Sequence, residues 1–115
     1  MHIDVVFVGI GVTDLATAVT WYSGLFDRAP DIPINDDEVM WHVAGTWIYL
    51  IRDAARAGQA LVTLAVPDLD ALCAELDGRG VPSAPIEIVG DAGRKARVSD
   101  PDGNTLAFIE VRGSG

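Results

Sequence analysis

Val12-Thr13-Asp14-Leu15 recurs as Val66-Pro67-Asp68-Leu69, 54 residues further along the chain. At both places a strand-like segment leads to an Asp, and apolar residues follow at the spacing that places them on one face of a helix. An Asp at this point can cap a helix, because its carboxylate accepts hydrogen bonds from the free backbone N–H groups. The repeat therefore predicts two similar halves, with helices near 14–25 and 68–79.

The strand before the first helix has two different sides. The β-branched residues at alternate positions from Val6 to Val12 share the side that packs beneath a helix, while Phe7, Gly9 and Gly11 face the other way. Glycines on a strand face usually mark a place where another group approaches closely. We therefore expect the glycine side of this strand to face a cavity.

Each half ends in short strands, predicted at 30–35, 39–44 and 46–51, and again at 85–89, 94–99 and 105–111. Asp100-Pro101-Asp102-Gly103-Asn104 predicts a tight turn between the last two. The predicted fold is α+β: two βαβββ modules, residues 1–52 and 61–112, joined by a linker at 53–60. Their strands are expected to form a curved mixed and antiparallel sheet around a shared cavity.

The composition limits the class of protein and its partners. A net charge of −9 opposes binding to nucleic acid or to an anionic membrane, and it favours a neutral or cationic small molecule. No apolar run approaches the ~18–20 residues that span a membrane, and no signal-peptide pattern is visible, so we expect a cytoplasmic protein. The single cysteine, Cys73, lies on the apolar face of the second predicted helix, which favours a small buried hydrophobe over a catalytic thiol.

The two repeated motifs, together with Trp21-Tyr22-Ser23-Gly24-Leu25-Phe26 and Asp100-Pro101-Asp102-Gly103-Asn104-Thr105-Leu106, resemble the vicinal oxygen chelate superfamily. That superfamily includes glyoxalases, extradiol dioxygenases, fosfomycin-resistance enzymes and bleomycin-binding proteins. The resemblance covers nearly the whole chain and implies the βαβββ fold, but it implies no single activity, because the scaffold carries many chemistries. Members commonly pair modules of two chains, so the resemblance also implies a homodimer.

Metal-dependent members of this superfamily place ligands at four equivalent slots, usually filled by His, Glu or Gln. The resemblance maps these slots onto Phe7, Tyr49, Leu61 and Ala107. Phe, Leu and Ala offer no N or O donor, and a single Tyr phenol with a pKa of about 10 does not hold a divalent ion. We therefore expect neither a metal nor another cofactor.

Displaced ligands are the alternative to a metal-free site. The remaining candidates are His2, Glu38, His42 and Glu110, of which Glu38 and His42 share one face of a predicted strand. Two ligands without a third make a poor metal site. A metal-dependent lyase or dioxygenase with displaced ligands is thus kept as an alternative.

The expected cavity is apolar and aromatic. Strand alternation places on its surface Phe7, Gly9, Trp47, Tyr49, Ile51, Leu61, Thr63, Thr105, Ala107 and Ile109. The strand at 39–44 leaves two options, Met40 with His42 or Trp41 with Val43. Arg97 either reaches the cavity or is a solvated cation at a strand edge.

Such a cavity suits a planar ligand that stacks on Trp and Tyr and is oriented by a few polar groups. The sequence therefore predicts a metal-free protein that binds a small aromatic or cationic molecule, either sequestering an antibiotic or binding a metabolite. One alternative is a metal-independent lyase, isomerase or cyclase that uses Tyr49, His42 or Arg97 as acid–base or oxyanion groups. Another is an accessory subunit with a vestigial pocket. No nucleophile–base pair is visible in the sequence, which favours binding.

Overall fold

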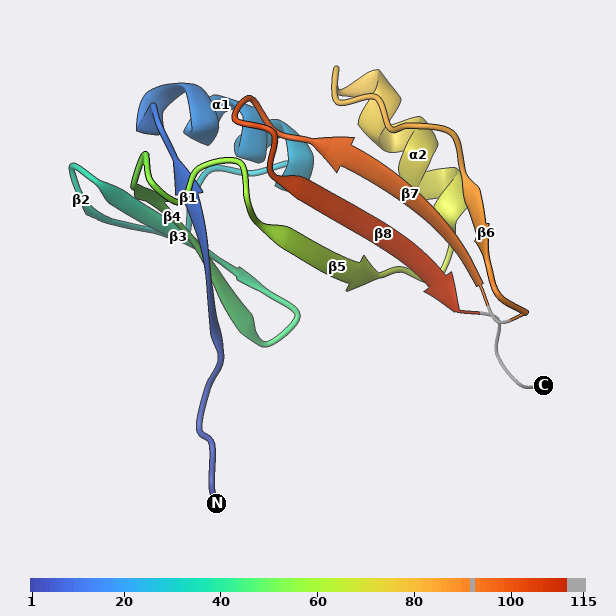
Figure 1. Ribbon diagram of the computed structural model, residues 1–115, viewed down its shortest axis with the longest axis horizontal. Helices are drawn as coiled ribbons and strands as arrows, with labels where there is room; N and C mark the ends of the chain where they lie inside the picture. The colour runs from blue at the N-terminus through green and yellow to red at the C-terminus, as the bar shows by residue number, and fades with distance from the viewer. Residues whose placement is uncertain (92, 112–115) are drawn as a thin grey trace.

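Each half of the chain folds into one helix and one four-stranded sheet (Figure 1). The computed structural model describes residues 1–91 and 93–111. The first half contains β1 (Phe7–Val12), α1 (Leu15–Phe26), β2 (Ile32–Asn35), β3 (Glu38–Val43) and β4 (Thr46–Arg52). The second contains β5 (Leu61–Ala65), α2 (Leu69–Gly78), β6 (Glu87–Val89), β7 (Gly93–Ser99) and β8 (Thr105–Val111). The predicted α+β fold, with the order βαβββ in each half, is confirmed.

The two sheets have the same topology. Their strand orders are β1-β4-β3-β2 and β5-β8-β7-β6. In each sheet the first strand pairs parallel to the last, and the remaining pairs are antiparallel. Hydrogen bonds thus form two four-stranded sheets, one in each half, and each contains parallel and antiparallel pairs. The module boundaries 1–52 and 61–112 remain a proposal, and residue 112 lies outside the described residues.

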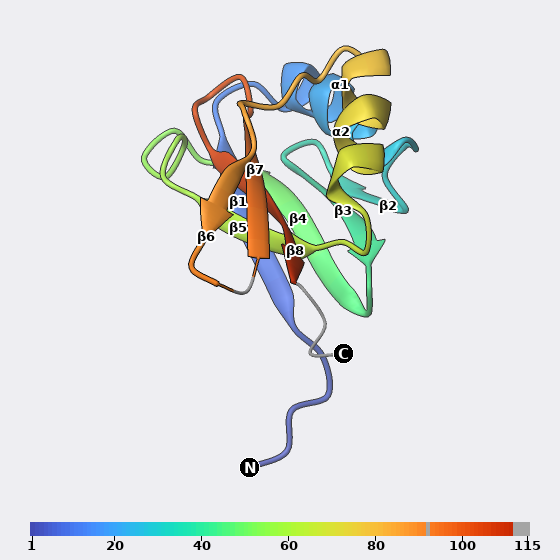
Figure 2. The same cartoon turned by 90° about the vertical axis from the view of Figure 1, so that its right-hand side faces the viewer.

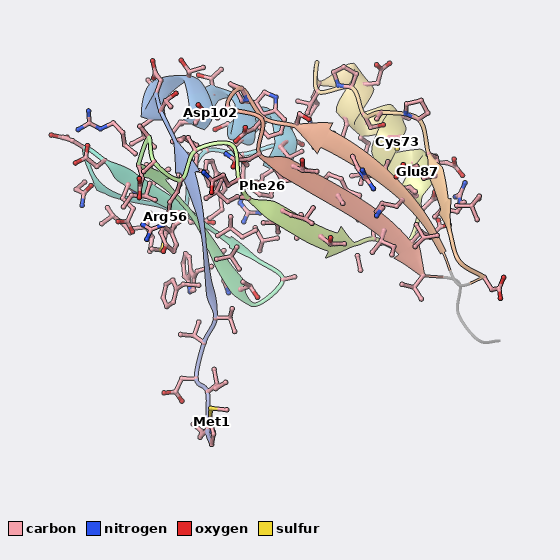
Figure 3. All side chains as sticks on the ribbon, in the orientation of Figure 1. Met1, Phe26, Arg56, Cys73, Glu87 and Asp102 are labelled. Atoms are coloured by element: carbon pink, nitrogen blue, oxygen red, sulfur yellow. The ribbon has the colours of Figure 1, made fainter. Side chains whose placement is uncertain are left out.

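The first strand begins later than its apolar pattern predicts. Val6 precedes β1 and is 51 % exposed, although its carbonyl still accepts a hydrogen bond from the Trp47 N–H at 3.0 Å. Residues 1–6 continue as an arm that leads away from the sheets to Met1 (Figure 3). The apolar residues of the arm remain exposed, among them Ile3 at 62 % and Val5 at 43 %.

Both helices begin where the repeat predicts. The Asp14 and Asp68 carboxylates accept hydrogen bonds from the N–H groups of Thr17 and Ala71, each at 3.0 Å. Such caps stabilise a helix by about 1 kcal/mol, because they satisfy backbone donors at its first turn. No helix in the described part of the chain is both long and apolar enough to cross a membrane.

The core lies between the helices and the sheet faces beneath them. Both views place α1 and α2 together at the top of the molecule, with the sheets below (Figures 1 and 2). Buried residues of both halves, such as Ile10 and Leu106, belong to one hydrophobic cluster. Trp41 is completely buried in it, with its ring 5.4 Å from that of Phe26. Cys73 packs against this cluster from α2, as expected for a small hydrophobe (Figure 3).

A buried amide ties the two halves together. Asn104, which has no exposed surface, donates to the Gly11 carbonyl and to the Asp100 carboxylate, both at 2.8 Å. Its side-chain oxygen accepts a hydrogen bond from the Ala60 N–H at 2.9 Å. One side chain therefore joins the first strand, the linker and the last turn.

The Asp100 carboxylate is the second member of this network. It accepts hydrogen bonds from the Tyr22 hydroxyl at 2.8 Å and from the N–H groups of Asp102 and Asn104 at 2.9 and 2.8 Å. Burial, reinforced by the bond to Asp100, raises the pKa of Tyr22 above its usual range. Tyr22 therefore remains a protonated donor, and α1 stays attached to the turn of the other half.

A cationic side chain from the second half caps the C-terminal end of α1. Arg79, just after α2, donates to the Gly24 carbonyl at 2.7 Å and to the Leu25 carbonyl at 3.0 Å. The last carbonyls of a helix have no partner within the helix and carry partial negative charge, so a guanidinium stabilises them. A side chain from the second half thus completes the helix of the first.

We expect Asn104→Ala to lower the free energy of unfolding by about 3 kcal/mol or more, because three buried hydrogen bonds are lost and each orphaned group costs about 1–3 kcal/mol. Urea titration followed by circular dichroism measures this. The matched control is Asn35→Ala, which removes one exposed bond to the Asp37 N–H and should change stability by about 0.5 kcal/mol. Equal losses in the two variants would show that Asn104 does not hold the halves together.

Candidate ligand-binding site

The face of the first sheet that points away from the helices carries four ring side chains. We call Phe7, His42, Trp47 and Tyr49 the aromatic patch. Phe7 and His42 flank Trp47 on the two neighbouring strands, and the His42 ring lies 4.7 Å from the Trp47 ring at an angle of 31°. Phe7 is 52 % exposed. The patch therefore presents flat apolar surface on which a planar molecule can stack.

The register of β3 resolves the ambiguity in residues 39–44. Met40 lies beside Tyr49, and His42 lies beside Trp47, so these two residues share the face of the patch. Trp41 points the other way, is 0 % exposed, and donates from its indole to the Arg28 carbonyl at 3.1 Å. The prediction of Trp41 as a ligand-binding residue is therefore wrong, because its large apolar ring is needed beneath α1.

The glycines of β1 face close neighbours, as their pattern predicts. A Cβ atom on Gly9 would lie 2.5 Å from both Cζ and Oη of Tyr49, and one on Gly11 would lie 2.9 Å from Cβ of Arg56. The groups that approach are thus parts of the same chain. Gly9 allows the Tyr49 ring to lie against β1, and Gly11 allows the linker to cross the strand.

The open face of the second sheet contains a cavity of about 380 Å³, a volume within the usual range for small-molecule sites. We call it the second-sheet hollow. Its lining residues come from the linker and from β5, β7 and β8: Gly58, Gln59, Ala60, Leu61, Thr63, Lys95, Arg97, Thr105 and Ala107. Five predicted site residues meet here, namely Leu61, Thr63, Arg97, Thr105 and Ala107. Ile109 shares this face beside Lys95, outside the lining.

A smaller cavity of about 230 Å³ adjoins the first. Its lining is Gly9, Gly11, Arg56, Gln59 and Ala60, and we call it the linker hollow. Gln59 and Ala60 line both cavities, so the two hollows are neighbours at the end of the linker. We refer to the two hollows together as the recess. The alternation of residues along strands could not predict that linker residues line these cavities, because their placement depends on how the linker folds back over β1. Lys95 could have been found, since it shares strand parity with Arg97.

The four positions that correspond to metal ligands in metal-dependent members of the superfamily do not fit a metal ion in this chain. Their side chains are those of Phe7, Tyr49, Leu61 and Ala107, with one phenol as the sole polar group. Phe7 and Leu61 are 52 % and 71 % exposed, whereas Ala107 is 1 % exposed. Over residues 1–91 and 93–111, no three His, Cys, Asp or Glu side chains gather closely enough to hold an ion.

Two of the displaced-ligand candidates are engaged elsewhere. His2 lies in the N-terminal arm, 2.7 Å from the Asp4 carboxylate. Glu110 accepts a hydrogen bond from the Leu69 N–H at 2.9 Å and pairs with Arg94. These contacts, the backbone bond first, hold the pKa of Glu110 below its usual range. Glu110 therefore supports the start of α2 and is turned away from both hollows.

Comparison with known proteins now identifies the family. Residues 2–108 match the family model described as Glyoxalase/Bleomycin resistance protein/Dioxygenase superfamily. The chain belongs to this superfamily. A search of curated proteins gave no match.

Several solved structures of the superfamily resemble this chain. A glyoxalase/bleomycin resistance protein from Catenulispora acidiphila has 35 % identity and a TM-score of 0.86, covering 93 % of this chain and 97 % of its own. An antibiotic-binding protein from a Streptomyces species has 26 % identity and a TM-score of 0.78, covering 96 % and 98 %. A lactoylglutathione lyase from Agrobacterium tumefaciens, with 16 % identity, a TM-score of 0.77 and coverage of 93 % and 92 %, shares the fold. These relatives include a binding protein and an enzyme, so the superfamily alone does not determine the function of this chain.

We expect Gly9→Ala to destabilise the protein by about 1–3 kcal/mol, the usual cost of overpacking, because the new methyl displaces the Tyr49 ring. In a Tyr49→Ala background the same change should cost almost nothing. Urea unfolding of the four proteins of this double-mutant cycle measures the coupling. Gly78→Ala is the control, because no atom lies within 4 Å of its added Cβ. Equal costs of Gly9→Ala in both backgrounds would contradict the packing described here.

Proposed function

We propose that this protein binds a small aromatic molecule without a metal and sequesters it without turnover. The observation that carries the proposal is the aromatic patch beside a recess whose family metal slots hold Phe7, Tyr49, Leu61 and Ala107. The antibiotic-binding relative is consistent with this function. Cytoplasmic location, the absence of a cofactor, and the absence of nucleic-acid and membrane partners remain predictions from the sequence.

The shape and chemistry of the site support an aromatic ligand. Trp47 and Tyr49 are partly buried, so their rings are held in place while one surface remains accessible. Aromatic rings favour offset-stacked or edge-to-face contacts with other rings. The hydroxyls of Thr63 and Thr105 in the second-sheet hollow supply directional polar contacts that orient a ligand.

A metal-independent lyase, isomerase or cyclase is the second candidate, with Tyr49, His42 or Arg97 in chemical roles. General acid–base catalysis requires groups within hydrogen-bond reach of the reacting atoms and usually of one another. His42 packs against Trp47, and Arg97 pairs with Glu87 at 3.3 Å. Within the described part of the chain, no hydrogen bond links Tyr49, His42 and Arg97. Binding is therefore the better supported function.

We also propose that the protein is a homodimer whose second copy covers the open sheet faces. Large apolar side chains are exposed there and in the arm, including Val5 at 43 %, Phe7 at 52 % and Leu61 at 71 %. Monomeric proteins rarely expose large contiguous apolar surface. The Cα radius of gyration is 14.7 Å, whereas a compact domain of this length has roughly 13 Å. A second copy would enclose the recess and exclude water from it.

We expect Trp47→Ala to raise the Kd for N-phenyl-1-naphthylamine, a neutral aromatic dye, at least tenfold, about 1.4 kcal/mol of binding free energy. The loss follows from removal of the largest stacking surface of the patch. Dye fluorescence titration measures the Kd. Trp21→Ala is the control, because Trp21 lies on α1, where its ring packs against Tyr22. If the dye binds the Trp47 variant as tightly as the unaltered protein, the proposed site is wrong.

Sedimentation equilibrium should give the mass of a dimer for the unaltered protein and that of a monomer for Leu61→Asp, because a buried unpaired carboxylate is costly at an apolar interface. The control is Ile88→Asp, since Ile88 is also 71 % exposed but points to the other side of its sheet from Leu61. A monomeric unaltered protein, or a dimer that survives Leu61→Asp and not Ile88→Asp, would exclude the proposed interface.

A further inference from the structure

The charges that line the recess are opposite to the charge of the protein. The chain has 17 acidic and 8 basic residues. Three of those basic residues, Arg56, Lys95 and Arg97, line the two hollows, and none of the described lining residues is acidic. A random selection from this sequence would favour carboxylates by about two to one. The recess is therefore a cationic region in an anionic molecule.

Lys95 is the most distinctive of these cations. It is partly buried in β7 and lines the second-sheet hollow, yet it forms no ion pair with any residue in 1–91 or 93–111. The other two cations have partners, Arg56 with Asp53 at 2.9 Å and Arg97 with Glu87 at 3.3 Å. Glu87 lies directly opposite Lys95 in the sheet, but its carboxylate pairs with Arg97. An ammonium without an ion partner of its own gains a charge-assisted hydrogen bond when an anion binds.

The hollow that contains the Lys95 ammonium also contains hydroxyl groups that can donate hydrogen bonds. Thr63 and Thr105 lie on β5 and β8, and Arg97 lies on β7 directly beside Ala107. Ala107 lies between Thr63 and Arg97 in the sheet register, and its side chain is a single methyl. An oxyanion at that position would be surrounded by hydroxyl, ammonium and guanidinium donors, which form the strong charge-assisted hydrogen bonds that anion sites use.

Two acidic residues of the first half are engaged outside the recess. Asp31 accepts a hydrogen bond from the His42 N–H at 2.7 Å and pairs with Arg28 at 3.1 Å, on the edge of β3. These contacts, with the backbone bond the larger cause, hold the pKa of Asp31 below its usual range. Asp37 pairs with Arg52 at 2.6 Å. These carboxylates form their own ion pairs outside the linings of both hollows.

We propose that the second-sheet hollow binds an anionic group of the ligand, a carboxylate, sulfonate or phosphate, while the ligand's aromatic part stacks on the patch. The inference rests on the proposed aromatic-binding function and adds the charge of the ligand. It favours an aromatic acid over the cationic ligand that the net charge of the chain suggested. Lys95 and Arg97 hold the anion, and Thr63 and Thr105 orient it.

Two dyes that share one aromatic framework test this inference. The anionic dye is 8-anilinonaphthalene-1-sulfonate, and the neutral dye is N-phenyl-1-naphthylamine, which lacks the sulfonate. Fluorescence titration gives a Kd for each, and the ratio of the neutral to the anionic Kd measures recognition of the sulfonate. We expect Lys95→Met to lower this ratio at least fivefold. Arg97→Met should act in the same direction.

Two further variants distinguish direct contact between Lys95 and the sulfonate from the effect of the protein's net charge. Lys95→Arg keeps the charge and should keep most of the ratio. Arg52→Met removes one positive charge from the ion pair with Asp37 on the first sheet, so it changes the net charge by the same amount as Lys95→Met. We expect Arg52→Met to leave the ratio unchanged.

The outcomes are distinguishable. If both dyes bind and no variant changes the ratio, the anion inference is wrong and the aromatic site stands. If Arg52→Met lowers the ratio as much as Lys95→Met, the effect comes from net charge and the anion inference is again wrong. If neither dye binds, or if binding of the neutral dye does not depend on Trp47, the proposed function itself fails, and the anion inference fails with it.

Discussion

The side-chain amide of Asn104 is fully buried. Its need for hydrogen-bond partners fixes the relative positions of three segments of the chain. A buried amide is tolerated only when its donors and acceptor are bonded, and here the partners are the Gly11 carbonyl, the Ala60 N–H and the Asp100 carboxylate. These three groups belong to β1, the linker and the last turn. Because Gly11 and Ala60 also line the linker hollow, the network that joins the halves also shapes the recess.

The bonds of Asn104, Tyr22 and Arg79 that join the halves leave the other sheet faces free. Nearly all of the buried apolar surface, including Ile10, Trp41 and Leu106, lies on the helix side. The open faces contribute little to the core of the single chain, so their residues can vary without loss of the fold. This division explains how a family ligand slot can hold Phe7 or Leu61 in a chain whose fold remains that of the superfamily. It also explains why the open faces are the natural place for a ligand and for a second copy.

The electrostatics of the recess are local. Charges separated by more than about 8–10 Å are largely screened at physiological ionic strength, so the net charge of −9 governs the approach of a ligand more than its final contacts. The charged residues that line the recess are Arg56, Lys95 and Arg97, of which Arg56 pairs with Asp53 and Arg97 with Glu87. In the proposed anion site, Lys95 has no ion partner among residues 1–91 and 93–111, so it would favour an anionic ligand over a neutral one of similar shape.

The sequence alone determined the two βαβββ halves, the Asp14 and Asp68 caps, the side of β1 that faces the core, and the unsuitability of Phe7, Leu61 and Ala107 as metal ligands. These follow from local hydrogen bonding, side-chain periodicity and donor chemistry, which a linear pattern records. The tertiary structure decided that Trp41 belongs to the core and that the linker contributes Gln59 to the recess. It also decided that Lys95 forms no ion pair within the described part of the chain. These depend on contacts between segments far apart in the chain, whose register and crossings no local pattern specifies.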